Sequence, residues 1–248
     1  MAHSTEGRAS GSGTGERRFV FPRWANYLLP LLVLGTLGAG LYVPTLVYIG
    51  FSPKATAVGY APPQPVEFSH ALHAGQLGMD CRFCHTTVEK AGFAAVPATQ
   101  TCMNCHTNIA GSTSRHPDDR VRRDKLALVK ESWETGKGIP WVKVHDLPDY
   151  AYFNHAAHIN KGIGCVSCHG RIDQMEVVTQ VAPLSMGWCL DCHREPEKHL
   201  RPKDQVTNMA WSAERDMGMS QIELGLKLKQ EYGIRDVAYM TSCYTCHR

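Results

Sequence analysis

Five short motifs of the same form constrain this chain more than any other feature. All ten cysteines occur in pairs separated by two residues, and a histidine follows every second cysteine: CRFCH (81–85), CMNCH (102–106), CVSCH (165–169), CLDCH (189–193) and CYTCH (243–247). C-x-x-C-H is the attachment signature of c-type haem. The two thiols bond to the two vinyl groups of one haem, and the adjacent histidine becomes the proximal ligand of its iron. The motifs therefore predict five covalently bound haems c.

The predicted attachment residues follow directly from these motifs. Zinc ribbons would need the cysteine pairs to combine in twos, which five pairs cannot do. A thioredoxin-like redox pair would be one motif beside a βαβ pattern. We therefore expect covalent bonds to haem from Cys81, Cys84, Cys102, Cys105, Cys165, Cys168, Cys189, Cys192, Cys243 and Cys246, and proximal iron ligation by His85, His106, His169, His193 and His247.

The N-terminal quarter of the chain predicts a membrane anchor. Residues 27–51 contain no charged side chain, and about 20 apolar residues suffice to cross a bilayer core. A cleavable signal peptide fits less well, because its apolar region is about 7–15 residues long. Four arginines precede the apolar segment and favour a cytoplasmic N-terminus under the positive-inside rule: Arg8, Arg17, Arg18 and Arg23.

These observations predict three regions. Residues 1–23 are expected to form a flexible cytoplasmic tail, residues 24–51 a single transmembrane helix in the cell (inner) membrane, and residues 52–248 a periplasmic domain with five haems. Covalent haem attachment takes place outside the cytoplasm, which agrees with this orientation. A run of small residues, Gly35, Gly38, Ala39 and Gly40, favours close packing of the anchor against a membrane partner.

An internal repeat organises the haem domain. EFSHALHAGQLGMDCRFCH (67–85) parallels YFNHAAHINKGIGCVSCH (152–169), with an aromatic residue, H-x-x-H, a glycine-bearing turn and then a haem motif. A second C-x-x-C-H motif follows each copy. The repeat predicts two dihaem modules, residues 67–110 and 152–199, and a fifth haem at 243–247.

The repeats also supply distal iron ligands. Histidines three residues apart lie on one face of a helix, whereas the two axial ligands of an iron lie on opposite faces of the haem. Each H-x-x-H therefore serves two different haems and brings them close together. The expected distal ligands are His70, His73, His155 and His158, with His145 as the fifth. His116, His199, Met186, Met209, Met217 and Met219 are the alternatives for the last iron, and His3 is expected to have no such role.

The remaining sequence predicts little regular secondary structure, with short α-helices wrapped around haems. Two longer helices are expected: 118–138, ending near Gly136, and 220–233, opened by a Ser220/Glu223 capping box. The formal charge of +3 does not indicate nucleic-acid binding, because the propionates of the haems would outweigh it.

F-x-H-x-x-H ahead of C-x-x-C-H resembles the class III (c3/c7-like) multihaem cytochromes. The order of apolar span, dihaem module, WVKVHDLPDY, dihaem module with MGWCLDCHR and terminal motif resembles the membrane-anchored pentahaem subunit of alternative complex III, a quinol:electron acceptor oxidoreductase. The resemblance implies an electron-transfer subunit that is not itself an enzyme. It further implies that His70 and His155 each bind the haem whose cysteines follow in the same module.

The resemblance also implies partners and a direction of electron flow. Electrons released by quinol oxidation in membrane and iron–sulfur subunits would pass through this chain to a periplasmic monohaem cytochrome c or an equivalent acceptor. A multihaem nitrite reductase would need an open iron position and often a C-x-x-C-K motif, and all five motifs here end in histidine. A short-anchor multihaem quinol dehydrogenase, which oxidises quinol itself, remains the alternative.

Overall fold

The computed structural model describes residues 21–50, 57–109 and 124–247. The chain divides after Gly50 into two compact units. In the described ranges all regular elements are helical, and β-pairing is limited to isolated bridges such as that between Ile163 and Leu200. The expected fold class, short helices joined by irregular chain after one N-terminal apolar helix, is confirmed.

Helix α1 (Ala25–Gly50) makes up the first unit. Its 26 residues and a mean hydropathy of 1.7 over its most apolar stretch make it long and apolar enough to cross a membrane. Pro30 and Pro44 lie within the helix without ending it. The hydroxyls of Thr36 and Thr45 each donate to a backbone carbonyl four residues earlier, at 2.7 Å. Both hydroxyls are thereby satisfied inside the segment, as a hydrocarbon environment requires.

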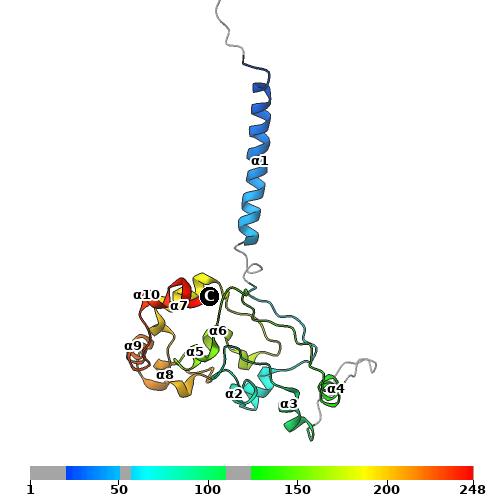
Figure 1. Ribbon diagram of the computed structural model, residues 1–248, viewed down its shortest axis with the longest axis vertical. Helices are drawn as coiled ribbons and strands as arrows, with labels where there is room; N and C mark the ends of the chain where they lie inside the picture. The colour runs from blue at the N-terminus through cyan, green and yellow to red at the C-terminus, as the bar shows by residue number, and fades with distance from the viewer. Residues whose placement is uncertain (1–20, 51–56, 110–123, 248) are drawn as a thin grey trace, which may run out of the picture. The chain divides into compact units, whose positions relative to one another are not determined.

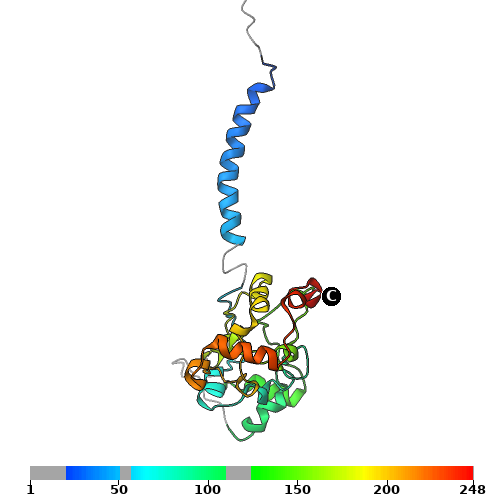
Figure 2. The same ribbon diagram turned by 90° about the vertical axis from the view of Figure 1, so that its left-hand side faces the viewer.

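The second unit consists of short helices and single helical turns (Figure 1). Its α-helices are α2 (Cys81–Cys84), α3 (Thr99–His106), α4 (Ala127–Thr135), α5 (His155–Ile159), α6 (Val166–His169), α7 (Met186–Arg194), α8 (Ala213–Met217), α9 (Gln221–Glu231), α10 (Val237–Met240) and α11 (Cys243–Cys246). The described part of this unit also contains the π-helical turn η1 (Ala71–Gln76) and the 3₁₀ turns η3 (Ile172–Gln174), η4 (Pro196–Lys198) and η5 (Lys203–Gln205). In Figures 1 and 2, helices α3 and α4 lie at the opposite end of this unit from α7 and α10, and Figure 1 shows α5 and α6 between them.

The two longer helices predicted from the sequence are present but shorter. Helix α9 begins after Ser220, whose side chain accepts a hydrogen bond from the backbone N–H of Glu223, as half of a capping box requires. The Glu223 carboxylate pairs with Lys227 instead of reaching back. The prediction of one helix over 118–138 was too long: α4 begins at Ala127, because Asp124 accepts from the backbone of Leu126 and holds a turn there. The predicted start at Asp118 lies outside the described residues.

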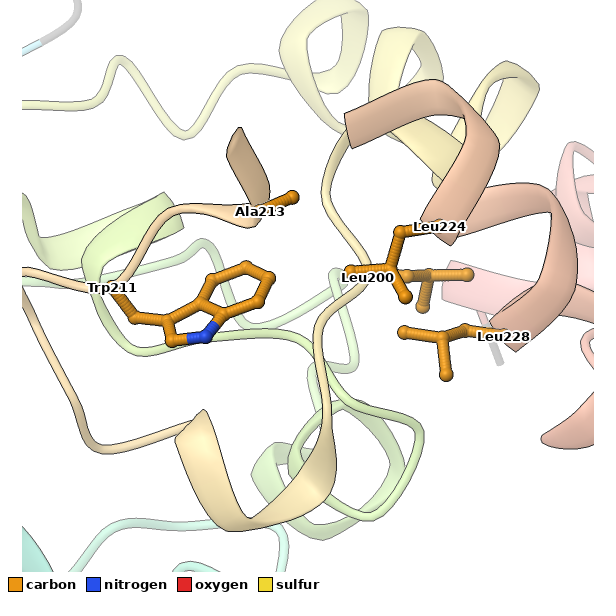
Figure 3. Packing of buried hydrophobic residues seen from close by; sticks show 5 residues of the cluster. All are labelled: Leu200, Trp211, Ala213, Leu224 and Leu228. Atoms are coloured by element: carbon orange, nitrogen blue, oxygen red, sulfur yellow. The ribbon is translucent and has the colours of Figure 1, made fainter. Parts of the chain in front are cut away.

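Apolar packing within the protein is small for a unit of this length. The larger buried cluster consists of Leu200, Trp211, Ala213, Leu224 and Leu228, shown in Figure 3. It joins α9 to the chain around η4, and Gly225 on α9 allows the helix to approach the backbone of Glu197 closely. The second cluster joins Val66 to Leu126 and Val129 near α4. Neither cluster extends between the haem motifs, so the protein chain alone does not supply a continuous core.

Candidate haem-binding sites

Each C-x-x-C-H motif begins with a single helical turn or ends a longer helix. In three motifs the histidine donates its backbone N–H to the carbonyl of the first cysteine, at 2.8 Å for His85, 3.0 Å for His169 and 2.9 Å for His247. Such i to i−4 bonds place the first cysteine and the histidine on one side of the turn. The side chain of Asp80 caps α2, and that of Ser185 caps α7, which fixes the start of each turn. The motif residues are therefore positioned locally, by helix formation alone.

All five motifs line one continuous cavity of about 3720 Å³. A pocket for a single cofactor-sized molecule is typically about 300–1,000 Å³. Divided equally among five motifs, the cavity provides roughly 740 Å³ for each, within that range. Its lining is mainly apolar side chains and histidines, as a porphyrin requires. The residues present thus fit several haems, which would fill the space between the two protein clusters.

The two H-x-x-H segments have the same local structure. Phe68 stacks on His73, with ring centres 4.4 Å apart, and contacts His70 edge-on at 4.9 Å. In the second copy Phe153 stacks on His158 at 4.5 Å and contacts His155 edge-on at 4.7 Å. The aromatic residue of the repeat therefore fixes the orientation of both imidazoles. The sequence indicated this residue as part of the repeat but did not indicate its contacts.

Three histidine pairs have the separation that a shared metal ion would need. A metal–imidazole bond is about 2.0–2.1 Å, and the ring centre lies about 1.2 Å behind the nitrogen, so two trans imidazoles have centres about 6.4 Å apart. The observed separations are 6.3 Å for His73 and His106, 6.5 Å for His155 and His169, and 6.2 Å for His158 and His193. In each pair, one ring belongs to an H-x-x-H segment and the other to a motif of the same module.

The fourth pair expected from the repeat is His70 with His85. Burial first, and then the charges of His85 and His73, together lower the pKa of His70 to about 4. The influence of His85 places its ring near His70. His73 with His106 and His158 with His193 are therefore equivalent pairs in the two modules. By their places in the repeat, His70 and His85 correspond to the pair of His155 and His169.

Hydrogen bonds orient most of these imidazoles for iron binding. Seven rings have Nδ1 within 2.7–2.9 Å of a backbone carbonyl, which fixes the tautomer with a free Nε2. They are His73, His85, His106, His155, His158, His193 and His247. Two ring Nδ1 atoms, those of His70 and His169, are buried and have no hydrogen-bond partner in the described residues.

Burial keeps the key imidazoles in the neutral form that binds metals. It lowers the pKa of His169 to about 3, with added effects from His145 and His155. It also lowers the pKa of His158, where the charge of His193 contributes in the same direction. An iron ligand at these positions would need no deprotonation at neutral pH.

The fifth predicted distal ligand, His145, lies beside His169 of the second module. Its ring centre is 4.4 Å from that of His169, with the ring planes at 72°. Among the described residues, the aromatic ring beside His247 is that of Tyr150, with ring centres 5.9 Å apart. The backbone carbonyl oxygen of Tyr150 lies 2.9 Å from His247 Nδ1. Among the alternatives, His199, Met186 and Met209 line the large cavity, and His116 lies outside the described residues. The distal ligand of the fifth iron stays a prediction.

The motifs follow one another in space in an order that differs from the sequence. Within the first module, burial and then the nearby Cys102 raise the pKa of Cys84. Within the second module, burial first, and then the charges of Cys192 and Cys189, together raise the pKa of Cys168 to about 12. The thiols of each module therefore lie close together.

The two modules meet at their first motifs. A hydrogen bond with Cys81 is the largest cause of the raised pKa of Cys165, so these two thiols are in contact. The segment 206–207 joins the same two motifs, because Thr207 donates to the Asp80 carboxylate at 2.8 Å and Cys165 donates its backbone N–H to the Val206 carbonyl at 3.0 Å. The first motif of one module thus faces the first motif of the other.

The terminal motif adjoins the second motif of the second module. His193 Nδ1 lies 2.9 Å from the carbonyl of Met240, three residues before Cys243. The charge of Cys246 also contributes to the raised pKa of Cys189, after burial. The resulting spatial order of motifs is 102–106, 81–85, 165–169, 189–193 and 243–247, consistent with the positions of α3, α6 and α7 in Figure 1.

A family comparison agrees with this arrangement. Residues 51–126 match the sequence model described as the class III cytochrome c family. The helical fold, the repeated H-x-x-H geometry and the five C-x-x-C-H motifs of this chain are therefore similar to those of class III multihaem cytochromes. Cytochromes of that class bind haem c covalently, and the paired cysteines of this chain have the spacing suited to the same attachment.

A curated relative is similar over most of the chain. It is the protein named "Menaquinone reductase, multiheme cytochrome c subunit" of Nitratidesulfovibrio vulgaris (strain Hildenborough). The two sequences are 27% identical over 186 residues, which cover 75% of this chain and 77% of the relative. That relative is thus a cytochrome subunit of a menaquinone reductase.

Proposed function

We propose that this protein is a membrane-anchored pentahaem cytochrome that relays electrons between a quinone-reacting partner and a periplasmic electron carrier. The observation that carries the proposal is the set of three imidazole pairs separated by 6.2–6.5 Å, which are suited to close irons from both sides. An iron with two protein ligands has no open position for substrate, so it exchanges electrons without binding one. The protein's part is to attach the haems, orient their ligands and exclude water.

The proposed axial pairs are His70 with His85, His73 with His106, His155 with His169, and His158 with His193. His247 would be the proximal ligand of the terminal haem. The ten motif cysteines would hold the five haems covalently, in dihaem modules 67–110 and 152–199 and at 243–247. Haem supplies the one-electron chemistry, and its potential depends on the ligands and their hydrogen bonds.

The spatial order of the motifs favours a single path for electrons. Its ends would be the haems of 102–106 and 243–247, and its junction would be the contact between the motifs at Cys81 and Cys165. Cys105 and Cys243, one in each end motif, are exposed, whereas the cysteines at the junction are partly buried. This difference in exposure favours entry of electrons at one end motif and their exit at the other.

The resemblance to alternative complex III and the curated relative support opposite directions of flow. The resemblance gives quinol oxidation in membrane and iron–sulfur subunits, with transfer to a monohaem cytochrome c or equivalent. The relative's name gives delivery of electrons to menaquinone. Both directions of flow require a quinone-reacting partner at one end of the haem path. Helix α1, with its N-terminus in the cytoplasm, would hold the haem domain on the periplasmic side of the membrane.

The test uses the purified full-length chain in detergent. We expect chemically reduced protein to pass electrons to a small soluble cytochrome c, and we expect neither menaquinol oxidation nor menaquinone reduction without partner subunits. Turnover of menaquinol by the partner-free chain would refute the relay and favour the short-anchor quinol dehydrogenase. Stopped-flow reduction of the acceptor, with the haem-free chain as control, provides the readout.

A further inference from the structure

His145 is a partly buried histidine for which the relay has no assigned role. It belongs to the segment WVKVHDLPDY between the two modules, and its Nε2 atom is buried without a hydrogen-bond partner among the described residues. Its ring lies edge-on to that of His169, with centres 4.4 Å apart. An unpaired buried imidazole nitrogen costs free energy, about 1–3 kcal/mol. A native fold retains such a group where it acquires a partner.

The separation from His169 excludes a shared iron. Two trans imidazoles need centres about 6.4 Å apart, whereas His145 is 4.4 Å from His169 and tilted by 72°. His155 meets that requirement, at 6.5 Å and with the rings inclined by only 12°. The axial position opposite His169 is therefore assigned to His155, and His145 stands beside the proximal ligand.

His169 lacks the hydrogen bond that the other proximal ligands have. His85, His106, His193 and His247 each have Nδ1 at 2.9 Å from a backbone carbonyl. The Nδ1 of His169 is buried and without such a partner. Metal-bound histidines almost always donate this N–H to an acceptor.

We propose that His145 is a positioning residue for the haem of motif 165–169, and that its Nε2 accepts a hydrogen bond from the Nδ1–H of His169. The two atoms are the donor and acceptor that each ring lacks, on rings whose centres lie 4.4 Å apart. Because χ2 of histidine is a soft torsion, each ring is free to turn its nitrogen towards the other. His145 remains neutral in this role, and no proton leaves either ring. The inference rests on the proposed ligation of iron by His169.

The bond has a chemical consequence. An acceptor on Nδ1–H increases the basicity of the coordinated imidazole. A more basic ligand stabilises the oxidised iron, so His145 would lower the potential of this one haem relative to the same haem without the bond. Because motif 165–169 lies at the junction between the modules, His145 would adjust the central step of the path.

A direct test uses the wild-type protein labelled with ¹⁵N-histidine and fully reduced. A scalar coupling between the Nδ1 of His169 and the Nε2 of His145, transmitted across an N–H···N bond, is expected. Its absence from a resolved His169 Nδ1–H signal would overturn the proposal. This measurement does not depend on the folding of any variant.

A second test replaces His145 with Leu or Gln. The control is Asp146→Asn, at an exposed neighbour that does not line the cavity. Loss of the hydrogen-bond partner of a metal ligand typically changes a metal site by about 10–100-fold. We expect His145→Leu to raise the potential of one haem by the equivalent of at least tenfold, about 59 mV for one electron. His145→Gln keeps an acceptor and should restore part of the shift, and Asp146→Asn should leave all potentials unchanged.

Two results of the second test would refute the proposal. Unchanged potentials in His145→Leu would exclude an effect on any haem. One additional carbon monoxide bound per molecule would instead identify His145 as an axial ligand. A haem content below five in the wild-type protein would count against the pentahaem function and not against this hydrogen bond.

Discussion

Replacement of His155 by alanine is the most specific test of the axial pairs. The His155 ring lies 6.5 Å from that of His169, and its Nδ1 is held at 2.9 Å by the carbonyl of Gly92 in the other module. Alanine removes the ring, and the nearest atom that remains on that side chain is a methyl group that cannot bind iron. One haem of the five should therefore lose its sixth ligand.

The magnitude follows from the count of motifs. One-fifth of the total haem should lose its low-spin spectrum, and the reduced variant should bind one carbon monoxide per molecule more than the wild type. His158→Ala should give the same increment at the haem of His193, and the double variant should give two. Phe153→Leu, which removes the stacking ring but keeps both ligands, should bind no more carbon monoxide than the wild type.

Carbon monoxide titration of dithionite-reduced protein measures the increment, and resonance Raman spectra report the spin state. A His155→Ala protein that remains wholly low-spin, with no added carbon monoxide, would refute the pairing with His169. If Phe153→Leu bound as much additional carbon monoxide as His155→Ala, the cause would be a general loss of packing around the haem and not the loss of one ligand.

Two further predictions concern stability. Gly225→Ala should lower the thermal unfolding temperature of the haem-loaded protein, because the added Cβ would overlap the Glu197 backbone. Such overpacking typically costs about 1–3 kcal/mol of stability. The control Leu226→Ala, on the exposed side of α9, should lower the unfolding temperature less. The pKa of Asp80 is lowered to about 2, first by its hydrogen bonds with Arg82 and also by one from Thr207. A carboxyl with a lowered folded-state pKa stabilises the fold above its unfolded pKa of about 3.9 and loses that effect as the pH falls towards 2. Asp80→Asn should therefore reduce the loss of stability between about pH 4 and pH 2. Chemical unfolding at each pH measures the free energy of unfolding. The same slope of that free energy against pH in the variant and the wild type would contradict the role given to Asp80.

The sequence predicts this protein well where its chemistry is local. A C-x-x-C-H motif needs one helical turn, and H-x-x-H needs one more, so both could be recognised without knowledge of the fold. The repeat 67–85 and 152–169 also indicated paired haems, and the structure gives the two copies matching ring contacts around Phe68 and Phe153.

The sequence predicts less where contacts join distant segments. The spatial order of the motifs depends on the hydrogen bond that Thr207 donates to Asp80, and these two residues are 127 positions apart in the chain. The neighbour of His145 likewise depends on how the segment 141–150 returns to the second module. No periodicity or spacing encodes such contacts, because haem-to-protein packing replaces the amphipathic patterns from which topology is usually inferred.

The mass of the intact, denatured chain tests the central claim most directly. Thioether bonds survive denaturation, so each attached haem adds its full mass to that of the polypeptide. The expected mass is that of the polypeptide plus five haems, because five complete motifs can each attach one. A homogeneous product with four haems would contradict the pentahaem path and, if peptide mapping found Cys243 and Cys246 unmodified, would remove the terminal haem from it.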